Sequence, residues 1–365
     1  MTRRILHVAG ARPNFIKIAA VVDACRRRTQ LDNILVHTGQ HYDEKMSDLF
    51  FRELGIPEPD LHLGVGGGSH AQQTARIMER FEGVVLDRRP DLVSVVGDVN
   101  STLACSLVAV KLGVPVAHVE AGLRSFDRTM PEEINRLVTD AVSDLLFVSE
   151  PSGVENLARE GAAPERVHFV GNVMIDTLLK HRERAARSDV LERMGLEPRS
   201  YAVVTLHRPA NVDRPESLRP ILTPIRELAE RMAVVFPVHP RTRAVLDPVL
   251  AEDGAPPGLR LVEPLGYLDF LRLTCDARVV LTDSGGIQEE TTVLRVPCVT
   301  LRDNTERPIT LSQGTNRLAG TTTTGIREAL AAALCAPPGD APPPPLWDGR
   351  AGERIADILA GGGRP

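Results

Sequence analysis

Short apolar runs alternate with segments of helical spacing along the whole chain. In the first half, the predicted strands are 3–10, 33–39, 91–98, 114–122, 144–150 and 166–172, and the predicted helices are 14–28, 71–88, 100–112, 132–143 and 151–160. Near-continuous apolar strands that alternate with helices are typical of a parallel sheet covered on both faces. The first half is therefore predicted to be a doubly wound, Rossmann-like α/β domain.

The second half repeats this alternation, so the fold class is predicted to be α/β with two Rossmann-like domains. Its predicted strands are 201–207, 233–239, 259–265, 277–283 and 297–303, and its helices are 215–231, 241–252, 267–275, 286–294 and 325–335. The polar segment 176–200 separates the halves, and the proline-rich segment 336–349 suits neither helix nor strand. A last amphipathic helix is expected to pack back on the first domain. The expected domains are 1–175 with the C-terminal helix (about 350–365), and 176–349.

Composition excludes several classes of function. The 365 residues carry a net charge of −5, which argues against a partner bound by phosphate neutralisation, such as a nucleic acid. The chain has five cysteines, an odd number, and none has CxxC spacing, so we expect neither a disulfide framework nor a zinc site. This cysteine content fits a protein of the reducing cytoplasm. The histidines show no HExxH, so no metal is expected. No apolar run is long enough for a signal peptide or a membrane span, so no membrane partner is expected.

Charged residues stand where the strands of the first half end. Arg12 and Lys17 flank the start of the first helix, a place that favours an anion, although a solvated pair is the alternative. The stretch lacks GxGxxG, so no nicotinamide cofactor is expected. Asp98 and Glu120 end two strands and Glu132 opens a helix, and such carboxylates can supply both a base and an acid. In "GDVNST", Asn100 or Ser101 is expected to cap the next helix.

A second group of candidates follows the strands of the second half. His207 ends a strand in "TLHRPAN" and suits an acid/base group or a phosphate partner, with a structural role as the alternative. In "LTDSGGIQEE", two glycines let a ligand approach the backbone, and the helix start offers N–H groups to a diphosphate. A carboxylate one helical turn after the glycines could accept hydrogen bonds from ribose hydroxyls. The candidate ligands of a nucleoside diphosphate here are Ser284, Gly285, Gly286, Glu290 and Arg307.

Together, these motifs resemble those of the non-hydrolysing UDP-N-acetylglucosamine 2-epimerases. "GARPNFIK", "TGQHY", "GDVNST", "HVEAGLRS", "PEEINR", "VGNVMIDTL", "HRPANVD", "DSGGIQEE" and "RDNTERP" occur in the family's order. The resemblance implies a glycosyltransferase-B-like fold with two domains facing across a cleft. It implies interconversion of UDP-GlcNAc and UDP-ManNAc without an added cofactor, and a homodimer.

The resemblance also assigns roles to residues by motif position. Leu265 and Phe270 fall where the family holds uracil, and Gln40 and His41 lie in a segment with which many bacterial members bind a second UDP-GlcNAc as activator. The active-site positions are Arg12, Lys17, Asp98, Glu120, Glu132 and His207, and the UDP contacts are Ser284, Gly285, Gly286, Glu290 and Arg307.

The chain departs from the family's pattern at two places. Ala210 replaces the glutamate of the common HRxEN motif, so any role of that glutamate is lost. "YDEKM" follows the TGQH segment and 65–74 is unusual, which weakens the case for activation by substrate. Four alternatives stay open: an epimerase of a modified sugar such as a diacetamido uronic acid, a UDP-sugar glycosyltransferase of the same fold, a hydrolysing epimerase and a nucleotide-sugar sensor.

The expected reaction avoids oxidation of the sugar. A base removes the proton on carbon 2 while UDP leaves, which gives a 2-acetamidoglucal, and UDP adds back after protonation from the opposite face. This route needs cationic groups for the diphosphate and carboxylates on two faces of carbon 2.

Overall fold

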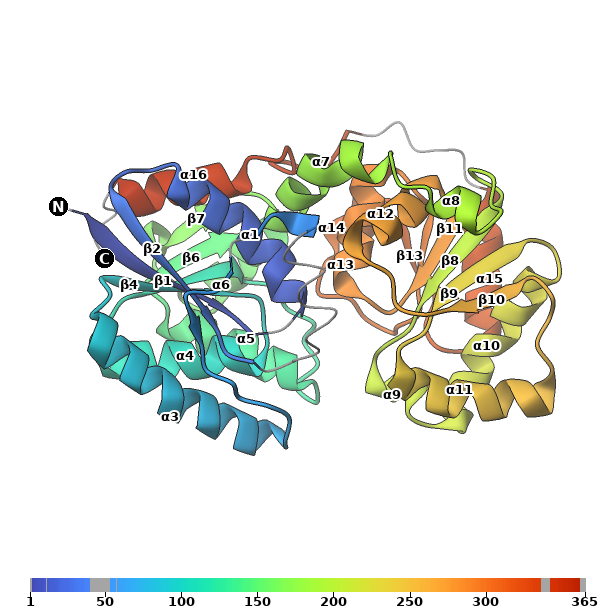
Figure 1. Ribbon diagram of the computed structural model, residues 1–365, viewed down its shortest axis with the longest axis horizontal. Helices are drawn as coiled ribbons and strands as arrows, with labels where there is room; N and C mark the ends of the chain where they lie inside the picture. The colour runs from blue at the N-terminus through green and yellow to red at the C-terminus, as the bar shows by residue number, and fades with distance from the viewer. Residues whose placement is uncertain (1, 11, 40–52, 57, 336–341, 362–365) are drawn as a thin grey trace. The chain divides into compact units, whose positions relative to one another are not determined.

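The computed structural model describes residues 2–10, 12–39, 53–56, 58–335 and 342–361, with the side chains of 12 and 13 excepted. The chain divides into two compact units. Unit 1 is Met1–Lys180 with Pro345–Pro365, and unit 2 is His181–Pro344. Each unit holds one parallel sheet with helices on both faces (Figure 1). The prediction of two doubly wound α/β units is therefore confirmed.

In unit 1 the sheet has the order β3-β2-β1-β4-β5-β6-β7. Helices α1 and α16 contact each other on one face, and α3, α4 and α5 cover the other (Figure 1). The strands are β1 (Arg3–Ala9), β2 (Leu31–His37), β3 (Leu61–His62), β4 (Leu92–Val96), β5 (Val116–Ala121), β6 (Leu145–Val148) and β7 (Val167–Phe169). The helices are α1 (Arg12–Arg26), α3 (His70–Arg88), α4 (Asn100–Lys111), α5 (Pro131–Val142), α6 (Pro151–Arg159), η1 (Pro164–Arg166), α7 (Val173–Ala185, which crosses into unit 2) and α16 (Ala351–Ala360).

In unit 2 the sheet has the order β10-β9-β8-β11-β12-β13. The strands are β8 (Tyr201–Thr205), β9 (Ala233–Pro237), β10 (Leu259–Val262), β11 (Val279–Thr282), β12 (Cys298–Thr300) and β13 (Asn316–Leu318). The helices are α8 (Val190–Arg193), α9 (Pro209–Val212), α10 (Pro215–Ala229), α11 (Pro240–Asp253), α12 (Tyr267–Asp276), α13 (Gly285–Leu294), α14 (Ile309–Ser312) and α15 (Thr323–Cys335).

The strand order reverses once in each sheet. In unit 1, β1 pairs with both β2 and β4, and in unit 2, β8 pairs with both β9 and β11. The chain leaves the two central strands toward opposite edges, so the loops at their carboxyl ends diverge and leave room for a ligand. The loops that follow β1, β4, β8 and β11 are therefore the places where a binding site is expected.

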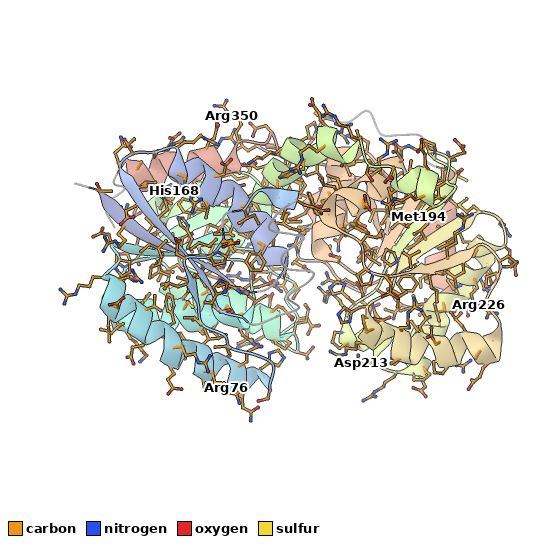
Figure 2. All side chains as sticks on the ribbon, in the orientation of Figure 1. Arg76, His168, Met194, Asp213, Arg226 and Arg350 are labelled. Carbon is orange, nitrogen blue, oxygen red and sulfur yellow. The ribbon has the colours of Figure 1, made fainter. Side chains whose placement is uncertain are left out.

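Local sequence explains why the elements begin and end where they do. At the start of α3, Ser69 accepts a hydrogen bond from the backbone N–H of Gln72 at 3.3 Å, and the Gln72 side chain accepts one from Ser69 N at 3.2 Å. This reciprocal pair satisfies two of the N–H groups that a helix start leaves without a partner. Arg76 of α3 and Arg350, which precedes α16, extend outward from the ribbon (Figure 2).

The structure differs from the predicted elements in the segment that separates the halves. Helices α7 and α8 occupy part of the segment 176–200. The polar composition of this segment did not predict these helices. Val173, Ile175 and Leu178 are almost completely buried, so an apolar side of α7 packs inward despite the charges on the other side. Strands β3 and β13 were also not predicted, because two or three residues are too few for a recognisable hydrophobic period.

The last segment of the chain completes the core of unit 1. Ile355 and Leu359 of α16 are fully buried, and α16 packs against α1. The backbone N–H groups of Ala351 and Gly352 donate to the carboxylate of Asp176 at 3.1 and 2.6 Å. Before the helix, the indole of Trp347 is buried and donates to the Ser149 carbonyl at 2.8 Å. Among the described residues, no helix combines the length and apolar character that a membrane crossing needs.

Gly171 lies against the segment that holds Leu346 and Trp347, and we expect the substitution Gly171→Ala to loosen that segment. Its φ of +90° disfavours any other residue, and an added Cβ would lie 2.9 Å from the carbonyl carbon of Leu346. The variant should lose at least about 1 kcal/mol of unfolding free energy. The emission of Trp347, the one tryptophan of the chain, should shift to longer wavelength.

The matched control for this prediction is Gly161→Ala. Gly161 has a similar φ of +82°, but an added Cβ would meet nothing within 4 Å. The control should lose a similar backbone contribution and keep the emission spectrum of the native protein. An unchanged spectrum in both variants would contradict the contact described for Gly171.

Candidate active site

A buried ion pair joins helix α1 to strand β5. The Lys17 ammonium on α1 contacts Oε2 of Glu120, the penultimate residue of β5, and both side chains are almost completely buried. Asn14, one turn before the lysine, donates to the Val96 carbonyl at 3.0 Å and ties α1 to the end of β4. Gly97 lies against this pair, because an added Cβ would be 3.5 Å from the lysine nitrogen. The two predicted residues are thus brought together.

The backbone of Glu120 is strained. Its φ is +71°, a left-handed conformation that residues other than glycine rarely adopt. The pairing of β5 with β6 shifts register between Val119 and Ala121, so Glu120 occupies a bulge. The Oε1 atom of this buried carboxylate has no hydrogen-bond partner among the described residues. Strain of this kind persists where the surroundings impose it, and it gathers at functional sites.

Asp98 is held by a second cation. Arg136 on α5 contacts Asp98 Oδ2, while its Nε and Nη2 donate to Glu133 Oε2 at 2.9 and 2.7 Å. Glu133 in turn accepts hydrogen bonds from the backbone N–H groups of Ser125 and Phe126. Burial alone would raise the pKa of Glu133, but these hydrogen bonds and Arg136 lower it below its ordinary value. The two predicted carboxylates, Asp98 and Glu120, therefore each have a cation of their own.

Glu132 lies beside this network on the first turn of α5 and is half-buried. The adjacent Glu133, and not Glu132, anchors the loop that follows β5. The prediction that Asn100 or Ser101 caps α4 is wrong, because Val99 is the N-cap and no side chain caps the helix. Asn100 donates instead to Gln73 of α3 at 2.8 Å, and Ser101 Oγ lies 2.8 Å from Thr38 Oγ1.

In unit 2, a buried carboxylate orients His207. Asp283 directly follows β11, is fully buried, and lies 2.8 Å from His207 Nδ1. It also accepts hydrogen bonds from Arg208 N at 3.0 Å and from Asn211 Nδ2 at 3.1 Å. Burial alone would raise the pKa of Asp283, but His207 and these donors lower it. The carboxylate therefore fixes the histidine ring through Nδ1, and the His207 side chain is 61% exposed.

The glycine turn places a helix start beside this histidine. Ser284 is the N-cap of α13, its N–H donates to Thr282 Oγ1 at 3.0 Å, and its hydroxyl does not cap the helix. Gly285 and Gly286 open the helix with no side chain in the way. An added Cβ on Gly285 would lie 2.8 Å from Glu306 Oε1 and close to the Arg307 guanidinium. Arg307 is thus presented at the start of α13.

Two carboxylates hold this arginine. Arg307 Nε lies 2.7 Å from Glu289 Oε1, and Nη1 contacts Glu306 Oε1. Arg302 lies 2.7 Å from the other oxygen of Glu306. All four side chains are almost completely buried. A buried arginine held at two points can present its guanidinium to a phosphate in a fixed direction.

Glu290 of unit 2 has a strongly shifted pKa. Burial and the adjacent Glu289 raise the pKa of Glu290 to about 8, although a hydrogen bond with Tyr267 lowers it. Tyr267 opens α12, and Leu265 and Phe270 lie half-buried just before and within the first turn of that helix. Glu290 and the two expected uracil contacts are thus connected through Tyr267.

Three predicted residues lie outside the described part. Arg12 is the first residue of α1 but its side chain is not described, and Gln40 and His41 are outside the described residues altogether. In the ranges that the structure covers, no group of three histidine, cysteine or acidic residues is arranged to hold a metal ion.

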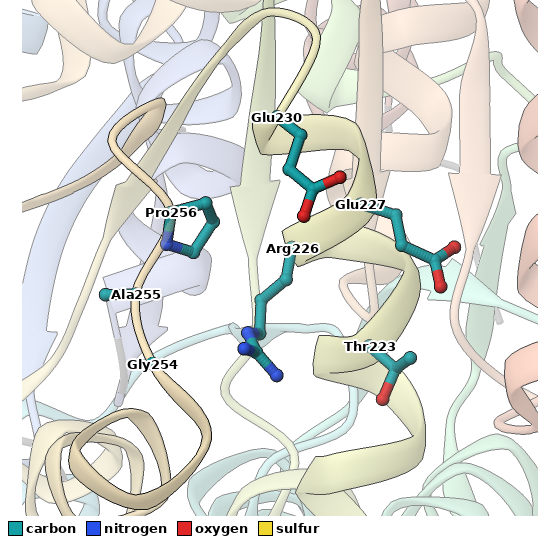
Figure 3. Close-up of a pocket in the computed structure, with 7 residues that line it drawn as sticks. All are labelled: Thr223, Arg226, Glu227, Glu230, Gly254, Ala255 and Pro256. Carbon is teal, nitrogen blue, oxygen red and sulfur yellow. The ribbon is translucent and has the colours of Figure 1, made fainter.

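A surface pocket elsewhere in unit 2 does not involve these residues. It has a volume of about 370 Å³ and is lined by α10 residues, among them Arg226 and Glu227, and by 254–256 (Figure 3). The end of α10 leads into β9, and 254–256 leads into β10, so the pocket lies at the amino ends of these strands. The candidate residues follow strand carboxyl ends, at the opposite edge of the sheet.

Sequence reasoning missed the residues that position the site. It assigned no role to Asp283, Arg136, Glu133 or Glu289. The available signal for Asp283 was an acid at the end of an otherwise buried strand. For Arg136 and Glu133, the signal was their i,i+3 spacing on a helix that opens beside two strand ends.

Comparisons with known proteins agree with this geometry. The family model "UDP-N-acetylglucosamine 2-epimerase" matches residues 23–360. A UDP-N-acetylglucosamine 2-epimerase of Methanocaldococcus jannaschii is 41% identical over 97% of this chain and 98% of its own. A UDP-2,3-diacetamido-2,3-dideoxy-D-glucuronate 2-epimerase of Pseudomonas aeruginosa is 42% identical over 98% of this chain and 99% of its own.

A solved structure shares the fold over the same length. The crystal structure of the M. jannaschii UDP-GlcNAc 2-epimerase in complex with UDP-GlcNAc and UDP superimposes with a TM-score of 0.92. The two chains are 41% identical, and the match covers 98% of this chain and 100% of the other. The two parallel units define a glycosyltransferase-B-like nucleotide-sugar fold. Within that class, the chain belongs to the UDP-N-acetylglucosamine 2-epimerase family.

The raised pKa of Glu290 predicts how stability changes with pH. Its value of about 8 in the folded protein exceeds the ordinary 4.5, so the folded state favours the protonated form. This contribution to stability is complete below about pH 4.5 and is lost as the pH rises through about 8. Glu290→Gln keeps the shape and cannot ionise. The variant should gain stability over the native protein between pH 5 and pH 9, by on the order of 5 kcal/mol at most.

Chemical unfolding at several pH values measures this difference. Glu216→Gln, at an exposed position on α10, is the control and should give a difference that does not vary with pH. A Glu290→Gln difference that stays flat, or that grows toward acid, would show that Glu290 is ionised in the folded protein.

Proposed function

We propose that this chain is a non-hydrolysing epimerase that interconverts UDP-GlcNAc and UDP-ManNAc. Membership of the family and the 41% identity over nearly the full length support this proposal. The observation that carries the chemistry is Glu120: a buried carboxylate on a strained backbone, with one oxygen on Lys17 and the other without a partner among the described residues. Such a group is suited to accept a proton from the substrate.

In the first step, the bond between sugar carbon 1 and the diphosphate oxygen breaks, and its electron pair leaves with UDP. The proton of carbon 2 passes to a carboxylate, and a double bond forms between carbons 1 and 2. We assign stabilisation of the leaving diphosphate to Arg307, the N–H groups at the start of α13, Lys17 and Arg12. The return step protonates carbon 2 from the opposite face, and UDP adds back to carbon 1.

We assign the proton transfers to the carboxylates of unit 1, which are Asp98, Glu120 and Glu132. His207, oriented by Asp283, would protonate or hold the leaving phosphate. In unit 2, Glu290 would bind the ribose hydroxyls, and Leu265 and Phe270 would flank the uracil. The reaction requires that both sets of groups act on one substrate molecule.

The identity of the sugar needs a direct test. The relative that is named for a diacetamido uronic acid sugar is as similar to this chain, at 42%, as the one named for UDP-GlcNAc, at 41%. Both names describe epimerisation at carbon 2 of an acetamido sugar nucleotide, so the proton transfers that we assign would apply to either substrate. A homodimer and an activating second UDP-GlcNAc at Gln40 and His41 stay predictions from the resemblance.

We further infer that the enzyme works in the cytoplasm. Its five cysteines are all free thiols, and three of them are buried. Free thiols fit a reducing compartment.

The function is tested with UDP-GlcNAc alone in heavy water. Deuterium at carbon 2 with UDP still attached supports the epimerase, and free sugar with UDP supports a hydrolase. If UDP-GlcNAc is unchanged, UDP-2,3-diacetamido-2,3-dideoxy-glucuronate is the next substrate. Deuterium in that sugar alone would assign the modified substrate, and no exchange in either would contradict an epimerase.

Glu120→Gln tests the proton transfer. The neutral amide cannot accept the carbon-2 proton, so deuterium incorporation should fall by about 10²–10⁴. UDP affinity should fall far less than exchange, because most of the UDP contacts that we assign lie in unit 2. Glu165→Gln, at an exposed site in unit 1, is the control. Equal loss of UDP binding and exchange would contradict the role proposed for Glu120.

Gly285→Ala tests the placement of the diphosphate. The added methyl group would displace Arg307 and Glu306, since Cβ would lie 2.9 Å from the guanidinium carbon. UDP affinity measured by calorimetry should fall at least about tenfold, which corresponds to about 1.4 kcal/mol. Gly83→Ala, in helix α3 with nothing within 4 Å of an added Cβ, should bind UDP normally. Normal binding by Gly285→Ala would place the diphosphate elsewhere.

A further inference from the structure

A completely buried histidine lies two residues before Glu120 on β5. His118 Nδ1 is 2.6 Å from Asp140 Oδ1 on α5, and Nε2 is 2.8 Å from the carbonyl oxygen of Gly97. The ring therefore bridges the end of β4 and helix α5. The functional assignment above gives it no role.

Both ring nitrogens face groups that accept hydrogen bonds. A carbonyl oxygen can only accept, so Nε2 carries a hydrogen. On the other side, Asp140 Oδ2 lies 2.7 Å from the Arg124 guanidinium and accepts the backbone N–H of Gly122 at 3.0 Å. A carboxyl group bonded in this way is ionised, so Nδ1 carries a hydrogen as well. With both hydrogens, His118 is an imidazolium cation.

The surrounding charges balance such a cation. Arg124 also binds Glu160, with contacts of 2.6 and 2.8 Å. The network then contains two cations, His118 and Arg124, and two carboxylates, Asp140 and Glu160. The Glu160 side chain is 38% exposed, so water screens its charge, and the two hydrogen bonds of the ring, rather than the charge count, assign the cation. On the far side of Gly97, Lys17 and Glu120 neutralise each other.

The same network holds the bulge at Glu120. Glu120, the residue in the left-handed conformation, has a support on each side. Before it, the Val119 carbonyl accepts a hydrogen bond from Gly97 N at 3.0 Å. Two residues after it, the N–H of Gly122 donates to Asp140. His118 joins these two supports, because one nitrogen binds the Gly97 carbonyl and the other binds Asp140. Without it, the chain near Glu120 would lose one of the ties between the end of β4 and α5.

We propose that His118 is a doubly protonated positioning residue whose bonds to Gly97 and Asp140 hold Glu120 in its strained conformation beside Lys17. The proposal rests on the proposed function where it concerns turnover. Its expected effect is on the rate of the proton transfer and not on the binding of UDP.

The protonation state is measured directly by nitrogen-15 NMR of histidine-labelled native protein at pH 7.5. Both ring nitrogens of His118, assigned with the His118→Gln variant, should have shifts of protonated nitrogens. His7 is the internal control: it is also buried in the sheet of unit 1, but burial lowers its pKa to about 4, so it should show one bare nitrogen. A bare nitrogen at His118 would overturn the proposal, whether or not the protein is an epimerase.

The positioning role is measured with two substitutions that each keep one donor. His118→Asn places an amide nitrogen near Nδ1, and His118→Gln places one near Nε2, so neither can bridge both acceptors. In the heavy-water assay, kcat should fall about 100-fold in both, as for other small misplacements of a reacting group. KM and UDP affinity should stay within about threefold, as expected when only the chemical step is affected. His7→Gln, which disturbs a buried histidine bonded to Asn33, should keep kcat.

The outcomes separate this inference from the proposed function. An active native enzyme whose two His118 variants keep kcat would overturn the positioning role, and so would a kcat loss matched by His7→Gln at equal loss of stability. If the native protein exchanges no deuterium into either substrate, the proposed function fails. A crystal structure of His118→Asn then decides the positioning role: Glu120 should leave the left-handed region, and an unchanged Glu120 would overturn it.

Discussion

The reversal of strand order in each parallel sheet is the constraint on which the rest of the structure depends. Parallel strands need crossovers through helices, and the direction of those crossovers changes between β1 and β4 and between β8 and β11. At both points, loops diverge at the carboxyl ends of buried strands. Lys17 and Asp98 of unit 1 follow β1 and β4, and His207 and the glycine turn of unit 2 follow β8 and β11, so one topological rule places two chemically different sets of residues.

The sequence was sufficient for the fold class and for the regular elements, because buried parallel strands are apolar runs and their helices carry a clear period. It could not predict β3 and β13, which are too short for a period, or α7, whose charged surface conceals its buried side. The positions of the candidate residues followed from the rule that ligands bind at strand ends. Their partners did not: Arg136 reaches Asp98 over 38 positions in sequence and Asp283 reaches His207 over 76, and nothing local indicates such pairs.

Buried charge is concentrated around these strand ends, and it is arranged in small groups of opposite charges. Lys17 neutralises Glu120, and Arg307 lies between Glu289 and Glu306. Replacing a buried ion pair with apolar residues often leaves stability unchanged or raises it, so such groups are poorly explained as devices for stability. A better explanation is that each buried partner fixes the orientation of a charged side chain. A carboxylate or guanidinium that is fixed by a buried partner cannot turn away from the reacting atom.

The return of α16 to unit 1 has a consequence for how the protein is made. On the ribosome, residues 1–180 emerge before unit 2, but Ile355 and Leu359, which are buried in unit 1, emerge after it. The nascent first half must therefore wait, with the α1 surface uncovered, while the whole of unit 2 is translated. Unit 2 is one continuous segment and can fold as soon as it leaves the exit tunnel. The later half of the polypeptide can thus reach its final state before the earlier one, and an exposed apolar strip on α1 is a natural target for chaperones during that interval.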